Sequence, residues 1–308
     1  MVAIRAYSGL RNESLPSLQQ SNLLDRLTRV VLLANPAHQT ALNSRKKLVQ
    51  KNIMQPHWEL GFSGSLLSCR ECTKESILWH HRRWLLHVIY GVPATAGTDS
   101  VPETVPVDAL EAEFACASTA CHLYPRNYHA WAHRRFCAEA LVAPLYPEVP
   151  SKSGALVKEY QWTLKWIESH VSDYSAMNHA VNFEQMLAGG KPTGLRLSTK
   201  VHAASLLRSY PDHESLWMYL RGSIPNEDED KDEEFAPMKG APSVQKFALR
   251  HVIWRKIFVS LFFLPPIVSC LKNETSKVKR FPSGHYVAHS LVIILRKRPS
   301  NRNPQLKH

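Results

Sequence analysis

Apolar residues recur at helical spacing along most of the chain, and short polar turns that contain proline separate the apolar stretches. Residues three and four positions apart lie on one face of a helix, and two stretches that follow this spacing are Leu24, Leu27, Val30, Val31 and Leu110, Phe114, Ala117, Cys121. Proline ends such a helix because its ring and its missing N–H forbid continuation. No Asn-Gly or Asp-Gly dipeptide occurs, so the strongest hairpin signal of β proteins is missing. The pattern predicts an all-α protein.

A motif recurs just after these turns. Its best copy begins at Pro125, with Tyr128 three positions later, Trp131 six positions later, and the pair Arg134 and Arg135 at nine and ten. A second copy starts at 211 and keeps Trp217 and Arg221, and a third, at 75–84, keeps Trp79, Arg82 and Arg83.

Three weaker copies complete the series. The copy at 36–46 has Leu42 in the tryptophan position, the copy at 173–179 has Met177 there, and a faint copy at 252–256 keeps only a basic pair. The tryptophan-equivalent positions are therefore 42, 79, 131, 177, 217 and 252. Their separations of 35 to 52 residues are typical of helical hairpins with insertions.

Each hairpin has an apolar face that it cannot bury alone, so the hairpins are predicted to stack into a solenoid. The tyrosine, the tryptophan and the second arginine of a copy lie at spacings of three and four and are expected to share a face. Tryptophan would fill the wedge between paired helices, and the arginine would reach the adjacent hairpin. The predicted repeat core is Trp79, Arg82, Arg83, Trp131, Arg134, Arg135, Trp217 and Arg221.

The motif resembles the repeat of the protein prenyltransferase α-subunit family. The residues that carry the resemblance are Arg126-Asn-Tyr-His-Ala-Trp131 and Pro211-Asp-His-Glu-Ser-Leu-Trp217. The resemblance implies a right-handed α-α superhelix of helical hairpins over residues 22–258. An N-terminal segment, 1–21, precedes it, and a basic tail, 259–308, is expected to be poorly ordered.

In that family the α subunit wraps around a catalytic β subunit that carries zinc. The resemblance therefore implies a heterodimer that transfers a farnesyl or geranylgeranyl group from its diphosphate to a protein with a C-terminal cysteine. No cofactor and no metal are expected on this chain, and without a β subunit it should be inactive.

The resemblance also implies site residues. Arg126 and Tyr128 match a lysine and a tyrosine that face the diphosphate at the subunit interface of family members. Arginine keeps the positive charge but binds as a planar fork, whereas lysine binds as a point charge. Asp173 and Tyr174 occupy the same turn one repeat later, which implies a place on the substrate side.

The other motifs in the sequence do not predict a metal site or a phosphate-binding loop. Cys69 and Cys72 lack a second pair of ligands at zinc spacing. His129 and His133 are four residues apart but do not form a His-Glu-x-x-His motif. No glycine-rich phosphate loop is present, and the acidic run 227–234 is expected to be an exposed loop.

Charge, hydropathy and cysteine content exclude some classes of partner and indicate a compartment. The formal net charge is +12, of which +8 lies between Pro265 and the end of the chain. Because this tail has few aromatic residues, it is only a weak signal for nucleic-acid binding, and no nucleic acid is predicted as a partner. The most apolar run, 257–271, has 15 residues and contains Pro265-Pro266, which is too short for a membrane span. Six irregularly spaced cysteines favour a reducing compartment, and the chain is predicted to be cytoplasmic.

Two functional interpretations remain open, and a nucleic-acid binder is a distant third. Arg126 and Tyr128 in the best-kept copy favour the subunit of a prenyltransferase. Loss of the tryptophan and of the basic pair in weaker copies favours a non-catalytic helical-repeat scaffold that binds other proteins.

Overall fold

The computed structural model describes residues 2–10, 18–91, 102, 104–142, 150–187, 198–224 and 242–263. This described part is built from α-helices joined by turns. The chain divides into a unit of residues 1–251 and a unit of residues 252–308, and each is considered by itself. The helices are α1 (Val2–Leu10), α2 (Leu18–Ala34), α3 (Gln39–Gln50), α4 (Pro56–Leu67), α5 (Ser76–Tyr90), α6 (Val107–Leu123), α7 (Tyr128–Val142), α8 (Pro150–Ser169), α9 (Tyr174–Met186), α10 (Thr199–Ser209), α11 (Glu214–Ser223) and α12 (Pro242–Phe263).

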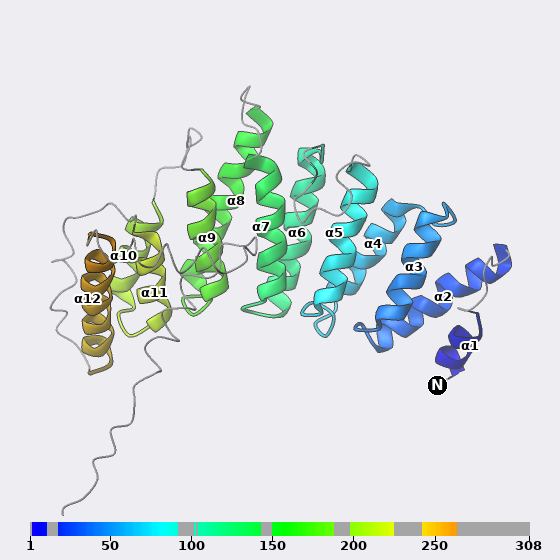
Figure 1. Ribbon diagram of the computed structural model, residues 1–308, viewed down its shortest axis with the longest axis horizontal. Helices are drawn as coiled ribbons and strands as arrows, with labels where there is room; N and C mark the ends of the chain where they lie inside the picture. Colours follow the sequence, from blue (N-terminus) through cyan, green and yellow to red (C-terminus); the bar gives the residue numbers. More distant parts are fainter. Residues whose placement is uncertain are drawn as a thin grey trace, which may run out of the picture. The chain divides into compact units, whose positions relative to one another are not determined.

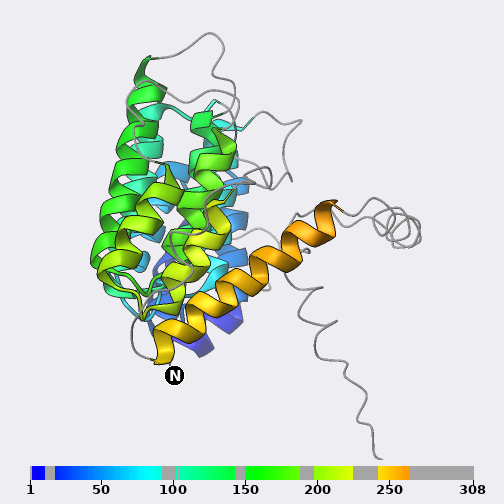
Figure 2. The same cartoon turned by 90° about the vertical axis from the view of Figure 1, so that its left-hand side faces the viewer.

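Helices of the first unit pack as successive hairpins, α2–α3, α4–α5, α6–α7, α8–α9 and α10–α11 (Figure 1). The first helices α4, α6 and α8 also pack on one another, and so do the second helices α5, α7, α9 and α11. The hairpins therefore form two layers, which Figure 2 shows from the end of the row. The all-α superhelix of helical hairpins that the sequence predicts is confirmed.

The tryptophans of the repeat lie in the core. Trp79, Trp131 and Trp217 are each at most 3% exposed, and Leu42 and Met177 are buried in the equivalent places. Each indole N–H has an acceptor. Trp79 Nε1 donates to the Thr73 carbonyl at 2.7 Å, and Trp217 Nε1 donates to the Pro211 carbonyl at 2.8 Å. In these two hairpins, a carbonyl of the turn before the second helix thus binds the indole N–H of the buried tryptophan.

Two further segments flank the five hairpins in the sequence. The N-terminal segment contains α1, whose buried Tyr7 hydroxyl bonds to Ser44 Oγ on α3 at 2.9 Å. At the other end, residues 242–263 form the single helix α12, so the faint sixth copy at 252–256 follows no turn and does not begin a second helix. The basic tail from 264 onward and the acidic run 227–234 lie outside the described residues.

The arginine that joins hairpins is the first of each pair, which corrects the prediction for the second. Arg134 is 1% exposed, whereas Arg135 is 38% exposed in its side chain and pairs with Glu139 on its own helix. Arg83 and Arg221 are likewise only half-buried. Arg134 lies three residues after Trp131 and points to the buried face of α7. Arg135, the next residue, is rotated by about 100° around the helix and faces the surface.

The buried arginine forms a triad with a glutamate and a histidine of the next hairpin. Arg134 on α7 binds both carboxylate oxygens of Glu159 on α8, with Nε to Oε1 at 2.9 Å. His179 on α9 contacts the same carboxylate through Nε2 at 3.1 Å. Arg134 Nη1 also donates to Ser118 Oγ at 2.7 Å and to the Phe114 carbonyl at 3.1 Å, both on α6. The arginine, the glutamate and the histidine together therefore connect four helices of two hairpins.

The same arrangement occurs at three successive junctions of the row. Each arginine binds both oxygens of its glutamate, each histidine contacts that carboxylate, and each arginine also donates to a hydroxyl and a carbonyl of its own hairpin's first helix. We call these three sets the triads: Arg45–Glu59–His81, Arg82–Glu113–His133 and Arg134–Glu159–His179.

The next junction changes all three members of the triad together. Ala180, Thr199 and Tyr219 stand at the positions of the arginine, the glutamate and the histidine. There the Thr199 N–H donates to Glu184 Oε2 at 2.8 Å, and the Tyr219 hydroxyl lies 3.2 Å from His202 Nδ1. Without a buried arginine, no buried carboxylate is needed to neutralise it, so the three changes are mutually consistent.

Replacing Arg134 by methionine would leave Glu159 buried without its cation. Removal of one partner of a buried ion pair typically costs about 3–5 kcal/mol, so we expect Arg134→Met to lower the free energy of unfolding by that amount in urea denaturation. Arg135→Met is the matched control on the same helix and should change it by less than about 1 kcal/mol. Similar losses in both variants would contradict the assignment of the first arginine to the junction.

Candidate functional site

The turn between α6 and α7 presents Arg126 to solvent. Arg126 is exposed and has a φ of 60°, in the left-handed region that few non-glycine residues adopt. This conformation reverses the chain after Pro125, so that α7 begins two residues later at Tyr128. A strained backbone persists only where its surroundings hold it in place.

Asn127 holds this turn. It is 2% exposed, and its Oδ1 caps α7 by accepting from the Ala130 N–H at 3.2 Å. Its Nδ2 donates to the Thr73 carbonyl at 2.9 Å, the same carbonyl that accepts from Trp79 Nε1. Arg126 and Tyr128 therefore flank an anchor fixed to the preceding hairpin, so the positions of their backbones are well defined.

Two tyrosines stand at the start of neighbouring second helices. Tyr128 opens α7 and is 65% exposed, and Tyr174 opens α9 and is 58% exposed. The expectation that the tyrosine shares the buried face of Trp131 is wrong, because the first residue of the helix lies outside the wedge that the tryptophan fills. Both phenol groups are free to meet a partner on this side of the row.

Asp173 takes the position of Asn127 one hairpin later and is 2% exposed. Its Oδ1 caps α9 by accepting from the N–H groups of Ser175 and Ala176 at 3.1 and 3.2 Å. Its Oδ2 accepts from Trp131 Nε1 at 3.3 Å and from Trp166 Nε1 at 3.0 Å. A substrate-side role for Asp173 stays a prediction, and these four contacts favour a structural one.

Arg83 on α5 brings positive charge to the side of His129 in the first turn of α7, where the carboxylate of Glu75 partly offsets it. Arg83 on α5 lies over the ring of Phe136 on α7, 4.9 Å from its centre. Burial lowers the pKa of His129, and the neighbouring His80 and Arg83 lower it further. The start of α7 adds N–H groups and the positive end of its helix dipole. This arrangement can receive an anion beside Arg126 and Tyr128.

The triad histidines are neutral in the folded protein. Burial lowers the pKa of His81, His133 and His179 despite the neighbouring carboxylates. In each ring Nε2 faces the glutamate, and Nδ1 is buried with no partner among the described residues. A bare Nδ1 acceptor costs less to bury than a charged N–H donor without a partner. The arginine and the glutamate therefore neutralise each other.

The remaining candidates show no catalytic arrangement. Cys69 and Cys72 are free cysteines, and burial raises the pKa of Cys72 to about 11, so it is not a reactive thiolate. His133 belongs to a triad, whereas His129 lies on the half-exposed face of α7. Within the described ranges, no three His, Cys, Asp or Glu side chains gather as a metal site. No helix in that part of the chain could span a membrane.

Sequence reasoning missed the triad glutamates and histidines and the Asn127 anchor. A signal for them exists. Histidine stands two residues after the tryptophan-equivalent position at 81, 133 and 179, and glutamate stands 18 to 20 residues before that position at 59, 113 and 159. The recurrence is visible in the sequence, but the bond between these residues is not.

Two segments of the chain match the model of a known repeat. Residues 110–141 and 156–185 match the protein prenyltransferase alpha subunit repeat, and they correspond to the α6–α7 and α8–α9 hairpins. The chain carries protein prenyltransferase alpha subunit repeats. The first of these matched repeats contains Arg126 and Tyr128, and the second contains Asp173 and Tyr174.

Named relatives with these repeats fall into two groups. The chain is 26% identical to protein prenyltransferase alpha subunit repeat-containing protein 1 of Danio rerio over 255 residues, 69% of this chain and 58% of that protein. It is 32% identical to repeat-containing protein 1-A of Xenopus laevis over 168 residues, 53% of this chain and 37% of that protein. Identity to geranylgeranyl transferase type-2 subunit alpha of Sus scrofa is 30% over 150 residues, 46% and 23% of the two chains. The chain thus spans less than two thirds of each of these relatives.

Asp173→Ala separates a structural from a substrate role for this repeat residue. The change removes a helix cap, worth about 1 kcal/mol, and leaves buried indole N–H groups without an acceptor at about 1–3 kcal/mol each. We expect the free energy of unfolding to fall by roughly 3–7 kcal/mol, measured by urea denaturation. Asp173→Asn keeps one of the two acceptor oxygens, so it can cap α9 or accept from the indoles but not both, and it should lose less than Asp173→Ala. Unchanged stability in Asp173→Ala would rule out the structural role.

Acid should destabilise the protein through the triad histidines. Their folded pKa values lie below the unfolded value of about 6.5, so the unfolded state binds more protons as the pH falls below that value. Stability is then full above about pH 7 and falls by up to about 1.4 kcal/mol per pH unit for each such histidine. Glu113 does not add to the slope between pH 5 and 6.5, because its pKa is lowered from 4.5.

His133→Gln tests this origin of the acid sensitivity. Glutamine can still donate to Glu113 but does not titrate. The slope of unfolding free energy against pH between 5 and 6.5 should therefore decrease by up to about 1.4 kcal/mol per pH unit, the contribution of one proton. A slope identical to that of the wild type would show that folding leaves the pKa of His133 unchanged, and a steeper slope would show that folding raises it.

Proposed function

We propose that this chain is the α-like subunit of a protein prenyltransferase heterodimer. In this proposal it supports transfer of a farnesyl or geranylgeranyl group from the diphosphate to the C-terminal cysteine of a protein substrate in the cytoplasm. The partner is a β subunit that carries the zinc and most of the isoprenoid pocket. Similarity to a geranylgeranyl transferase type-2 subunit alpha and the matched repeats support this proposal.

The observation that carries the proposal is the turn at Arg126. A cation and a phenol flank an anchored residue, with further positive charge from α5 and the first turn of α7 beside them. When the substrate thiolate bonds to C1 of the isoprenoid and the C1–O bond breaks, negative charge builds on the departing diphosphate. Arg126 would stabilise that charge with a bidentate contact, and the Tyr128 hydroxyl would donate to a diphosphate oxygen.

Arg126 would act only with the partner subunit in place. The described part of this chain shows no cluster of metal-ligating side chains, and a cysteine substrate reacts as its thiolate. In the proposal, zinc on the β subunit supplies that activation. Measurable prenylation by the pure, zinc-supplied single chain would refute this division of labour.

Single-turnover prenylation by the reconstituted heterodimer tests the role of Arg126. Loss of a charge-assisted contact made in the transition state should lower the rate of Arg126→Ala by roughly 10–1000-fold, or about 1.4–4 kcal/mol. Arg126→Lys should restore part of the rate, because it returns the charge without the fork. Arg250→Ala, which removes an exposed arginine paired with Glu214, is the charge-matched control and should keep the wild-type rate.

The outcomes distinguish the two functional classes. Equal rates in all variants would remove Arg126 from the active site but leave the subunit assignment intact. Stoichiometric recovery of a β subunit without transfer by any variant would favour a non-catalytic scaffold, which agrees with the changed residues at 42, 177 and 180.

A further inference from the structure

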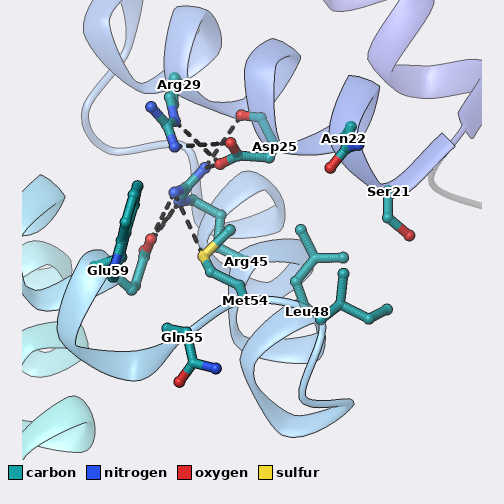
Figure 3. Close-up of a pocket in the computed structure, with 11 residues that line it drawn as sticks. Ser21, Asn22, Asp25, Arg29, Arg45, Leu48, Met54, Gln55 and Glu59 are labelled. Atoms are coloured by element: carbon teal, nitrogen blue, oxygen red, sulfur yellow. Dashed lines mark hydrogen bonds and ion pairs between the residues drawn. The ribbon is translucent and has the colours of Figure 1, made fainter. Parts of the chain in front are cut away.

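A cavity of about 300 Å³ lies between α2, α3 and α4, near the start of the row and apart from the α6–α7 turn (Figure 3). Helix α2 contributes Ser21 and Asn22 to its lining, α3 contributes Leu48, and the turn before α4 contributes Gln55. Helix α4 contributes Trp58 in its first turn. This volume is at the lower end of the range for small-ligand sites.

The charges in the wall are paired within the protein. Arg45 is 1% exposed and binds Glu59 through Nε at 2.9 Å and Asp25 through Nη1 at 2.8 Å. Arg29 also forms an ion pair with this aspartate, at 2.8 Å from Asp25 Oδ2. Figure 3 shows these ion pairs along one side of the cavity. A charged ligand would compete with a triad, so the cavity fits an uncharged one.

Three neutral polar groups of the lining are without partners among the described residues. Ser21 is 2% exposed, and its buried Oγ has no hydrogen bond there. The side-chain amides of Asn22 and Gln55 are exposed and likewise make no hydrogen bond to the described part. In Figure 3 the two amides lie at opposite ends of the cluster, with Arg45 and Met54 between them. The two exposed amides offer both donors and acceptors, which matches peptide groups.

The rim of the cavity is apolar. Trp58 is 77% exposed, the highest value among the large apolar side chains of the described part, and Ile53 is 40% exposed. Leu48 and Met54 continue this surface inward, where Leu48 is buried. Tryptophan is enriched among the residues that dominate binding energy at protein interfaces. Its exposure beside a hollow indicates a partner surface at this point.

We propose that this cavity binds a short, extended, uncharged peptide segment of a partner protein. One apolar side chain of the segment packs against Leu48, Met54 and Trp58, and its peptide groups bond to the exposed amides of Asn22 and Gln55. The proposal does not depend on prenyl transfer, since it uses none of the residues near Arg126.

Blocked pentapeptides test the proposal with the full chain. The probes are acetylated and amidated alanine pentapeptides with leucine, lysine or glutamate at the centre, titrated against the protein and followed by ligand-observed NMR. The leucine peptide should bind roughly tenfold or more tightly than either charged peptide, because burial of an unpaired charge is unfavourable. Equal affinity for all three, or no binding at millimolar peptide, would overturn the proposal.

Variants at the rim locate the binding. Trp58→Ala should weaken binding of the leucine peptide about tenfold or more, and Gln55→Ala should weaken it less. Both residues are exposed, so thermal melting should stay at the wild-type value. Leu249→Ala removes an apolar side chain that is 60% exposed on α12 and should bind like the wild type. Unchanged binding in Trp58→Ala would refute the site, and concentration-dependent dimerisation that Trp58→Ala abolishes would assign the cavity to a second copy of this chain.

Discussion

A buried arginine is stable only when its charge is neutralised and its N–H groups are bonded, and this requirement governs how the hairpins stack. In each triad the arginine comes from one hairpin, and the carboxylate and histidine come from the next. Apolar surfaces alone can slide past one another, because burial is not directional. The triads fix one register between neighbours, and the row keeps this register from α2 to α9.

The candidate site depends on that register. Asn127 reaches back to the Thr73 carbonyl of the preceding turn, and Asp173 receives the indole N–H of Trp131 from the preceding hairpin. These bonds bring the starts of the second helices to the same side of the row. Arg126, Tyr128 and Tyr174 are exposed there because the residues beside them carry the structural contacts. A slip between hairpins would separate the two tyrosines and the positive charge that accompanies them.

The two proposed binding regions occupy different parts of the row and have different chemistry. The Arg126 turn gathers cations and suits an anion, whereas the cavity at α2–α4 has its charges paired internally and suits an uncharged peptide. One chain of helical repeats can therefore present several partners with separate surfaces, since each hairpin contacts only its neighbours.

The sequence by itself determined the helices, their turns and the repeat, because proline, tryptophan and helical spacing act within about a dozen residues. It also pointed to Arg126 and Tyr128 through the motif that contains them. Only the tertiary structure decided which arginine of each pair is buried, since positions 134 and 135 differ by 100° around a helix whose neighbour the sequence does not show. The triads, the bond from Trp131 to Asp173 and the bond from Asn127 to the Thr73 carbonyl join residues 14 to 54 positions apart. Such bonds exist only once the hairpins have stacked.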